Sequence, residues 1–197
     1  MEEDFLGSVV KMVFNDIPPS IRFGEEDAKV ILKYSRELEG ITDELVKGFY
    51  DLLFSHPATA AVFKEGERPA REETLRNWWL RTVRGPFDEQ YWKWQAYVGV
   101  VHFRRGITNS MMMAMYAWVV GRTAELLSGR LPPQAVSEVS QSLLKLAVTG
   151  AALTVAGYEG LMEEGFAEEV GADPQLVRNI VAMKADQLKR PLDPHNQ

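Results

Sequence analysis

One histidine in the chain has a setting suited to metal binding. His102 lies near the end of the apolar and aromatic segment 91–107, and steps of three or four residues back from it reach Val98, Gln95 and Tyr91. On a helix these residues share one face, which we expect to point inward. A neutral imidazole in an apolar wall can coordinate iron, and a proximal histidine is a standard ligand of haem iron. The same setting is more often that of a core or cleft histidine bonded to backbone or a carboxylate, so this segment alone leaves both interpretations open.

The composition indicates a single domain with extensions at its ends. The chain has 197 residues, of which 46% are hydrophobic and five are tryptophan, so a sizeable core is available. The formal net charge is -6 at pH 7, and no basic run offsets it. A partner whose phosphates must be neutralised is therefore disfavoured, and we expect no nucleic-acid ligand.

The absence of cysteine restricts the chemistry further. A chain without cysteine has no disulfide, zinc–thiolate site, iron–sulfur cluster or thiol nucleophile, and it suits a reducing cytoplasm. Acidic residues at positions 2–4 stand where an export signal has basic ones. The longest apolar stretches, residues 111–121 and 147–157, are shorter than the ~20 residues of a membrane helix. We therefore expect a cytoplasmic protein without a membrane span.

Hydrophobic spacing and helix-end signals predict helices throughout, with no strand and no internal repeat. Thr42, Asp88 and Thr108 are suitable N-caps for the helices that follow them. Gly150 and Gly157 in the longest helix permit another helix to approach closely. The expected helices cover residues 4–15, 25–39, 43–55, 58–63, 69–84, 89–105, 109–127, 134–164 and 174–189. The chain is predicted to be all-α.

Three patterns resemble the sensor-globin and protoglobin branch of the globins. The residues at positions 98, 99, 104, 106 and 107 match the spacing around the histidine of that branch's proximal helix, although Arg105 stands where the pattern usually has Ile. Phe49 and Tyr50 resemble the Phe-Tyr pair of its B helix. Trp78 resembles a tryptophan that is frequent in its E helix.

This resemblance implies a fold and its boundaries. The fold would be a globin fold of the three-over-three type, in its sensor-globin variant, with extra N-terminal and C-terminal helices. An N-terminal extension helix would cover residues 1–20, the globin domain residues 21–166, and a C-terminal helix and tail residues 167–197. The family usually forms a homodimer through its last two globin helices, and the segment with Gly150 and Gly157 is expected to provide a close-packing surface there.

The resemblance also implies a cofactor, haem b (iron protoporphyrin IX), and roles for particular residues. His102 would be the proximal iron ligand, and Tyr50 the distal residue whose hydroxyl reaches an iron-bound gas, because a phenol donates hydrogen bonds. The alternative for Tyr50 is a core tyrosine whose hydroxyl meets a backbone carbonyl. Arg71 and Arg104 could pair with the haem propionates. His56 and His195 are poorly placed as a second ligand. The residues expected to pack against haem are Phe54, Leu75, Trp78, Val98, Val101, Met112, Met115 and Tyr116.

The function expected from these features is reversible binding of a diatomic gas, O2, CO or NO, by a single-domain sensor or carrier. One alternative is a haem enzyme for nitric oxide dioxygenation or peroxide chemistry. It would need a reductase or an acid–base group near the iron, and neither is evident in the sequence, so catalysis is less favoured. The other alternative is a haem-free regulator with a globin fold. Having both His102 and Tyr50 favours the haem protein.

Overall fold

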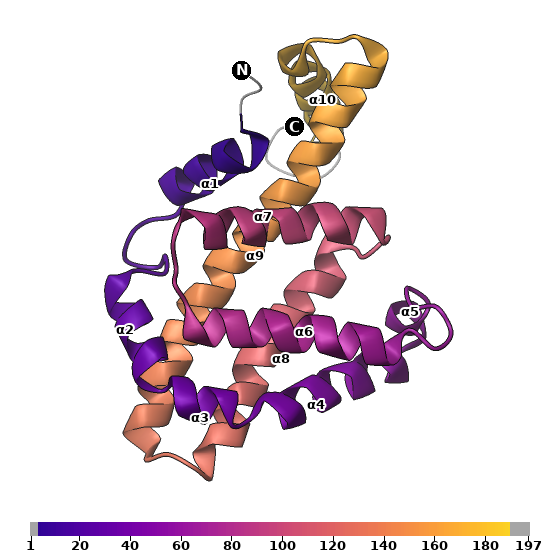
Figure 1. Ribbon diagram of the computed structural model, residues 1–197. Helices are drawn as coiled ribbons and strands as arrows, with labels where there is room; N and C mark the ends of the chain where they lie inside the picture. Colours follow the sequence, from indigo (N-terminus) through magenta and orange to yellow (C-terminus); the bar gives the residue numbers. More distant parts are fainter. Residues whose placement is uncertain (1–3, 190–197) are drawn as a thin grey trace. The chain divides into compact units, whose positions relative to one another are not determined.

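The computed structural model describes residues 4–189, and these residues form helices and no strand (Figure 1). The all-α prediction is confirmed. The helices are α1 (Phe5–Asp16), α2 (Glu25–Lys33), α3 (Ser35–Glu39), α4 (Thr42–Ser55), α5 (Pro57–Ala60), α6 (Arg68–Arg84), α7 (Glu89–Arg104), α8 (Asn109–Ser128), α9 (Pro133–Val170) and α10 (Pro174–Lys189). The chain divides into two compact units, Met1–Tyr158 and Glu159–Gln197. The boundaries expected at residues 20 and 166 stay a prediction.

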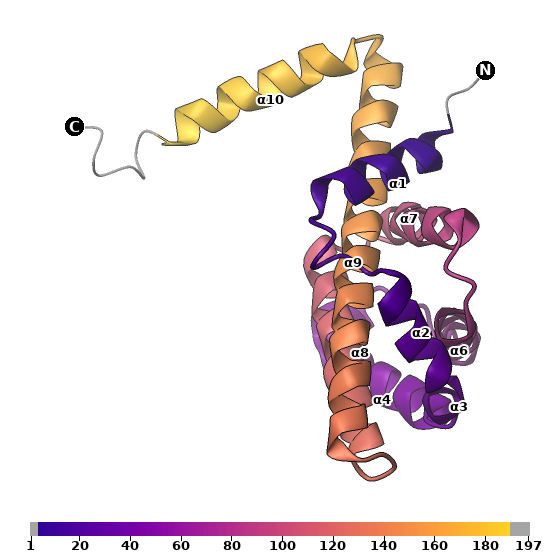
Figure 2. The ribbon, with the colours of Figure 1, turned by 90° about the vertical axis from the view of Figure 1, so that its left-hand side faces the viewer.

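The first unit has its helices in two layers around one core. Figures 1 and 2 show α6 and α7 on one side and α8 with the first part of α9 on the other. The core joins both layers, and its fully buried side chains include Trp79 on α6, Tyr91 on α7, Leu127 on α8 and Leu153 on α9. α1 packs against α7, where the Phe14 and Trp92 rings meet edge to face at 5.2 Å. The N-terminal extension thus supports the helix that carries His102.

The second unit consists of the end of α9 and α10. Arg178 on α10 forms an ion pair with Glu163 on α9. Several apolar side chains here are more than half exposed, including Phe166, Leu176 and Ile180. His195 lies outside the described residues.

Two details of the predicted helices are wrong. The helix expected at residues 25–39 breaks at Tyr34, whose backbone leaves the helical region with φ -105° and ψ 16°. The indole of buried Trp79 donates to the Leu38 carbonyl beyond this break at 3.0 Å, a tertiary contact that sequence spacing does not reveal. Thr42 does not cap α4 but is its first residue, and its hydroxyl donates to the Glu39 carbonyl at 2.7 Å.

Helix α9 is longer than expected and continues through Gly165 to Val170. Among residues 4–189 it alone is long and apolar enough to cross a membrane, judged by length and composition only. Leu143, Leu146 and Leu153 of this helix lie in the core of the first unit. Packing inside that unit therefore accounts for part of its apolar character, while Leu144 and Val148 are exposed.

Candidate functional site

The helix that carries His102 is held by a cap and by a close crossing. The Asp88 side chain accepts a hydrogen bond from the Tyr91 N–H at 2.8 Å, as expected for an N-cap. Further along α7, a Cβ on Gly99 would lie 2.0 Å from the Thr154 carbonyl oxygen, and one on Gly157 would lie 2.2 Å from the Ala96 carbonyl oxygen. Only glycine allows two backbones to approach this closely. α7 is thus fixed on α9 one turn before His102.

A cavity of about 290 Å³ lies beside His102, at the small end of the roughly 300–1,000 Å³ range of ligand pockets. Its walls come from α4, α6, α7 and α8, so residues far apart in the sequence meet around it. Eleven of the residues singled out in the sequence line this cavity: Phe49, Tyr50, Arg71, Leu75, Trp78, Val98, Val101, His102, Met112, Met115 and Tyr116. Their binding roles stay a prediction.

Phe54 is the exception among the expected packing residues. It does not line the cavity, although it lies one turn after Tyr50. Its ring packs instead against Phe63 at 5.0 Å and against Tyr50 at 6.4 Å between centroids. Phe54 therefore supports the cavity wall from behind.

The structure adds lining residues that the sequence analysis did not select. Trp94 and Tyr97 precede Val98 and Val101 by three or four positions, so helical spacing could have identified them. Phe63 lies in the segment after α5 and carries no such signal. Arg105 also lines the cavity, whereas Arg104 is exposed and does not.

His102 is largely buried, and its Nδ1 has no hydrogen-bond partner among the described residues. Burial, with the neighbouring Arg105 guanidinium as a smaller cause, lowers the pKa of His102 to about 4. The imidazole is therefore neutral at pH 7, which is the form that binds a metal. A core histidine bonded to backbone or a carboxylate would have such a partner at one of its two ring nitrogens.

Tyr50 forms the hydrogen bond to a backbone carbonyl that we expected if it were a core tyrosine. Its hydroxyl donates a hydrogen bond to the Arg71 carbonyl oxygen at 2.8 Å, and only 6% of the residue is exposed. Burial raises the pKa of Tyr50 to about 12, so the phenol keeps its proton at neutral pH. Because it also lines the cavity, this hydroxyl can donate to a bound ligand if it exchanges the Arg71 carbonyl for that ligand.

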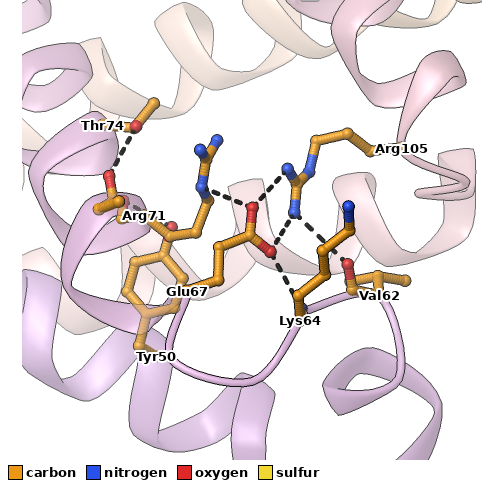
Figure 3. A network of polar contacts seen from close by, with 8 residues as sticks. Tyr50, Val62, Lys64, Glu67, Arg71, Thr74 and Arg105 are labelled. Carbon is orange, nitrogen blue, oxygen red and sulfur yellow. Dashed lines mark hydrogen bonds and ion pairs between the residues drawn. The ribbon is translucent and has the colours of Figure 1, made fainter.

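A charged cluster includes two arginines that line the cavity, Arg71 and Arg105 (Figure 3). Glu67 receives hydrogen bonds from both terminal amino groups of Arg105, at 2.8 and 3.0 Å, and one from the Lys64 N–H at 3.0 Å. Arg71 Nε lies 3.1 Å from the same carboxylate as an ion pair without hydrogen-bond geometry. The bonds from Arg105 first, and then that from Lys64, lower the pKa of Glu67 to about 2. The pair of Glu67 and Arg105 joins the start of α6 to the end of α7.

A buried polar network lies behind two of the aromatic walls. Gln95 Oε1 accepts hydrogen bonds from the Trp78 indole at 3.4 Å and the Tyr116 hydroxyl at 3.3 Å. Gln95 Nε2 donates to the Tyr91 hydroxyl at 2.7 Å. These bonds fix the orientation of Trp78 and Tyr116 relative to α7.

The residues around the cavity fit a haem group. His102 offers a neutral imidazole, the walls offer apolar surface with three adaptable methionines, and guanidinium groups stand at one edge. Within residues 4–189 no group of three or more His, Cys, Asp or Glu side chains could hold a metal ion. His102 would thus be a single protein ligand, as a proximal histidine is in globins.

The fold defines the class of the protein. It is similar to the solved globin domain of the Geobacter sulfurreducens globin-coupled sensor, with a TM-score of 0.66 and 21% sequence identity over 75% of this chain and 96% of that one. The chain therefore has an all-α globin fold, which confirms that prediction.

The family follows from the sequence profile of Protoglobin, which matches residues 18–164. The chain belongs to the Protoglobin family, in agreement with the resemblance noted above. No curated protein sequence matches it.

Proposed function

We propose that this protein binds haem b and, on its iron, a diatomic gas such as O2, CO or NO, reversibly and as a sensor or carrier. The observation that carries the proposal is the neutral, partly buried His102 with a buried and unpartnered Nδ1 on the wall of an apolar cavity. Membership of a globin family supports the same cofactor.

His102 holds the iron in this proposal, and Tyr50 acts on the bound gas. When bound, haem would supply an iron that can bind the gas, and His102 would be the residue that holds it. The lining residues of α6, α7 and α8 surround the porphyrin and exclude water. The Tyr50 hydroxyl, which donates to the Arg71 carbonyl in the structure, would be the hydrogen-bond donor available to a gas in the cavity.

Titration of the apoprotein with hemin tests the proposal. We expect a Soret band that saturates at one hemin per chain and a ferrous form that binds CO reversibly. His102→Ala should weaken binding and shift the band, because iron loses its protein ligand. His56→Ala, a change at an exposed histidine, should behave as the parent does. A parent protein that takes up no hemin would refute the proposal.

We also propose a homodimer through α8 and α9. Leu144 and Val148 on α9 and Met113 on α8 are 42–56% exposed in the single chain, which is unusual for large apolar residues on core helices. Ala117 and Gly121 on α8 are exposed and small, so a second copy could approach closely.

The expectation that Gly150 and Gly157 belong to this surface is wrong. Both glycines are buried inside the first unit, where Gly150 faces the Tyr116 ring and Gly157 faces Ala96. They serve contacts within one chain.

A further inference from the structure

One part of the cavity wall is not helical. The lining residues that lie outside helices are Val62 and Phe63, in the segment 61–67 between α5 and α6, and Arg105 and Ile107, after the end of α7. We call residues 61–67 the α5–α6 loop. Its residues 64–66 are exposed, so the loop separates the cavity from solvent. Because a loop detaches with the loss of fewer backbone hydrogen bonds than a helix, we expect the cavity to open here first.

Both ends of the α5–α6 loop are held to α4. In α5, the Thr59 hydroxyl donates to the Leu53 carbonyl at 2.6 Å. At the start of α6, the Arg68 guanidinium donates to the Asp51 carboxylate at 2.7 Å. Neither bond reaches residues 61–67 themselves, so the contacts that hold the middle of the loop lie elsewhere.

One side chain from the far side of the cavity holds the loop between these two points. Arg105, the C-cap of α7, donates to both oxygens of Glu67 at 2.8 and 3.0 Å and to the Val62 carbonyl at 3.4 Å (Figure 3). Its guanidinium carbon also lies 5.9 Å from the centre of the Phe63 ring. Among the described residues, every hydrogen bond that ties the loop to a segment other than α5 or α6 comes from Arg105.

The pair of Arg105 and Glu67 differs from an ordinary surface ion pair. It is bidentate, and its two side chains are only 23% and 15% exposed, so water and salt screen it less. It also depends on this particular arginine. Arg105 stands where the sensor-globin pattern usually has Ile, which can donate none of these hydrogen bonds. The attachment of the loop to the end of α7 is thus a feature of this chain's own residues.

We propose that Arg105 is a latch on the entrance to the cavity, and that a ligand enters when the Arg105–Glu67 pair opens and the α5–α6 loop moves away from α7. The identity of that ligand, haem, rests on the proposed function, whereas the latch itself does not. Arg105 is three residues after His102, and Phe63 of the loop packs against Tyr50 at 5.8 Å between centroids. The latch therefore joins the end of the histidine helix to the opposite wall of the cavity.

A protease that cleaves only after lysine tests the latch without haem. Lys64 is the only lysine of residues 4–189 that lies outside a helix, so cleavage of the apoprotein after Lys64 measures opening of the loop. Arg105→Ile should raise this cleavage rate about tenfold, which corresponds to ~1.4 kcal/mol. Glu67→Gln, which removes the charge of the other partner, should raise it as well. Neither change adds or removes a lysine.

Arg84→Ile is the matched control. Arg84 forms a bidentate pair of the same kind with Glu39, at 3.0 and 2.6 Å, between α6 and α3, and it does not line the cavity. This variant should be cleaved after Lys64 at the parent's rate. Circular dichroism and melting curves verify that each variant is folded.

Stopped-flow uptake of hemin tests the entrance. Quenching of tryptophan fluorescence follows uptake, since Trp78 and Trp94 line the cavity, and transfer to excess apomyoglobin follows release. Arg105→Ile should speed both uptake and release, by up to about tenfold, and should change the affinity little, because the latch closes the empty and the filled cavity alike. An arginine that only contacted the ligand would lower the affinity and would not speed uptake.

Each outcome decides one part of the proposal. Equal cleavage after Lys64 in the parent and in folded Arg105→Ile would overturn the latch. Faster cleavage with unchanged rates for hemin would overturn the entrance. A parent that takes up no hemin would overturn the proposed function, and the cleavage result would still decide whether Arg105 holds the loop. Faster cleavage, uptake and release in Arg105→Ile but not in Arg84→Ile would support the proposal.

Discussion

The Tyr50 hydroxyl donates a hydrogen bond to the Arg71 carbonyl across the gap between α4 and α6. A phenol has one proton to donate, so the carbonyl and a bound gas compete for it. Under the proposed function, Tyr50 would thus contribute less to gas affinity than a free hydroxyl, because binding would exchange one hydrogen bond for another.

Tyr50→Phe should consequently speed dioxygen release by less than the roughly tenfold that a full hydrogen bond of ~1.4 kcal/mol would give. Carbon monoxide accepts hydrogen bonds less well, so its release should change little. Stopped-flow measurement of both dissociation rates checks this. Equal dioxygen rates in the parent and the variant would mean that the hydroxyl stays on the Arg71 carbonyl.

Acidification should destabilise the apoprotein through His102. The pKa of His102 is about 4 in the folded chain, compared with an ordinary value near 6.5. Between these values the unfolded chain binds more protons than the folded one, so the free energy of unfolding falls as pH decreases from 6.5 toward 4. The contribution of His102 over the whole window is up to about 3 kcal/mol.

Urea unfolding of the apoprotein at pH 7 and pH 5 measures this effect. His102→Leu should show a smaller loss of stability between the two pH values than the parent, and exposed His56→Gln should lose as much as the parent. The same loss in His102→Leu as in the parent would contradict a neutral, buried imidazole.

Helical spacing was sufficient to place the part of the cavity wall that α7 contributes. His102, Val98 and Val101 follow from steps along α7, and the same steps reach Trp94 and Tyr97. They also distinguish the two arginines, because Arg105 is three residues after His102 and returns to its face, whereas Arg104 is two residues after it and points away. The motif match drew attention to Arg104, but Arg105 is the arginine of this pair that lines the cavity.

Contacts between segments that are distant in the sequence could not be predicted from helical spacing. Glu67 and Arg105 are 38 positions apart, and nothing in either local sequence pairs them. Gly157 illustrates a different limit: a glycine indicates that something approaches closely, but it has no side chain whose chemistry identifies the neighbour. It was assigned to an interface between chains, and it meets α7 of its own chain.

A charge on the exposed face of α9 should dissociate the proposed dimer. Leu144 and Val148 are one turn apart and are 55% and 42% exposed. The double change of Leu144→Asp with Val148→Asp places two carboxylates in an apolar interface, where they lose hydration without a partner. Sedimentation velocity should show a monomer for this variant and a dimer for the parent.

Leu52→Asp provides the matched control, since Leu52 is 41% exposed but lies on α4. It should remain dimeric. A parent that sediments as a monomer at micromolar concentration would contradict the dimer.

The crossing of α7 and α9 should tolerate no side chain at Gly99. A Cβ there would lie 2.0 Å from the Thr154 carbonyl oxygen and 2.7 Å from the Tyr158 nitrogen, and backbone atoms cannot rotate away. Gly99→Ala should therefore lower the free energy of unfolding by ~1–3 kcal/mol or more, the usual cost of overpacking a core. Gly165→Ala, in α9 with open space around it, should instead stabilise the helix by up to ~1 kcal/mol. Urea unfolding of the two variants measures this difference.

Because Gly99 is one turn before His102, Gly99→Ala should also weaken hemin binding. A folded Gly99→Ala with the parent's stability would show that α7 can move away from α9 at little cost.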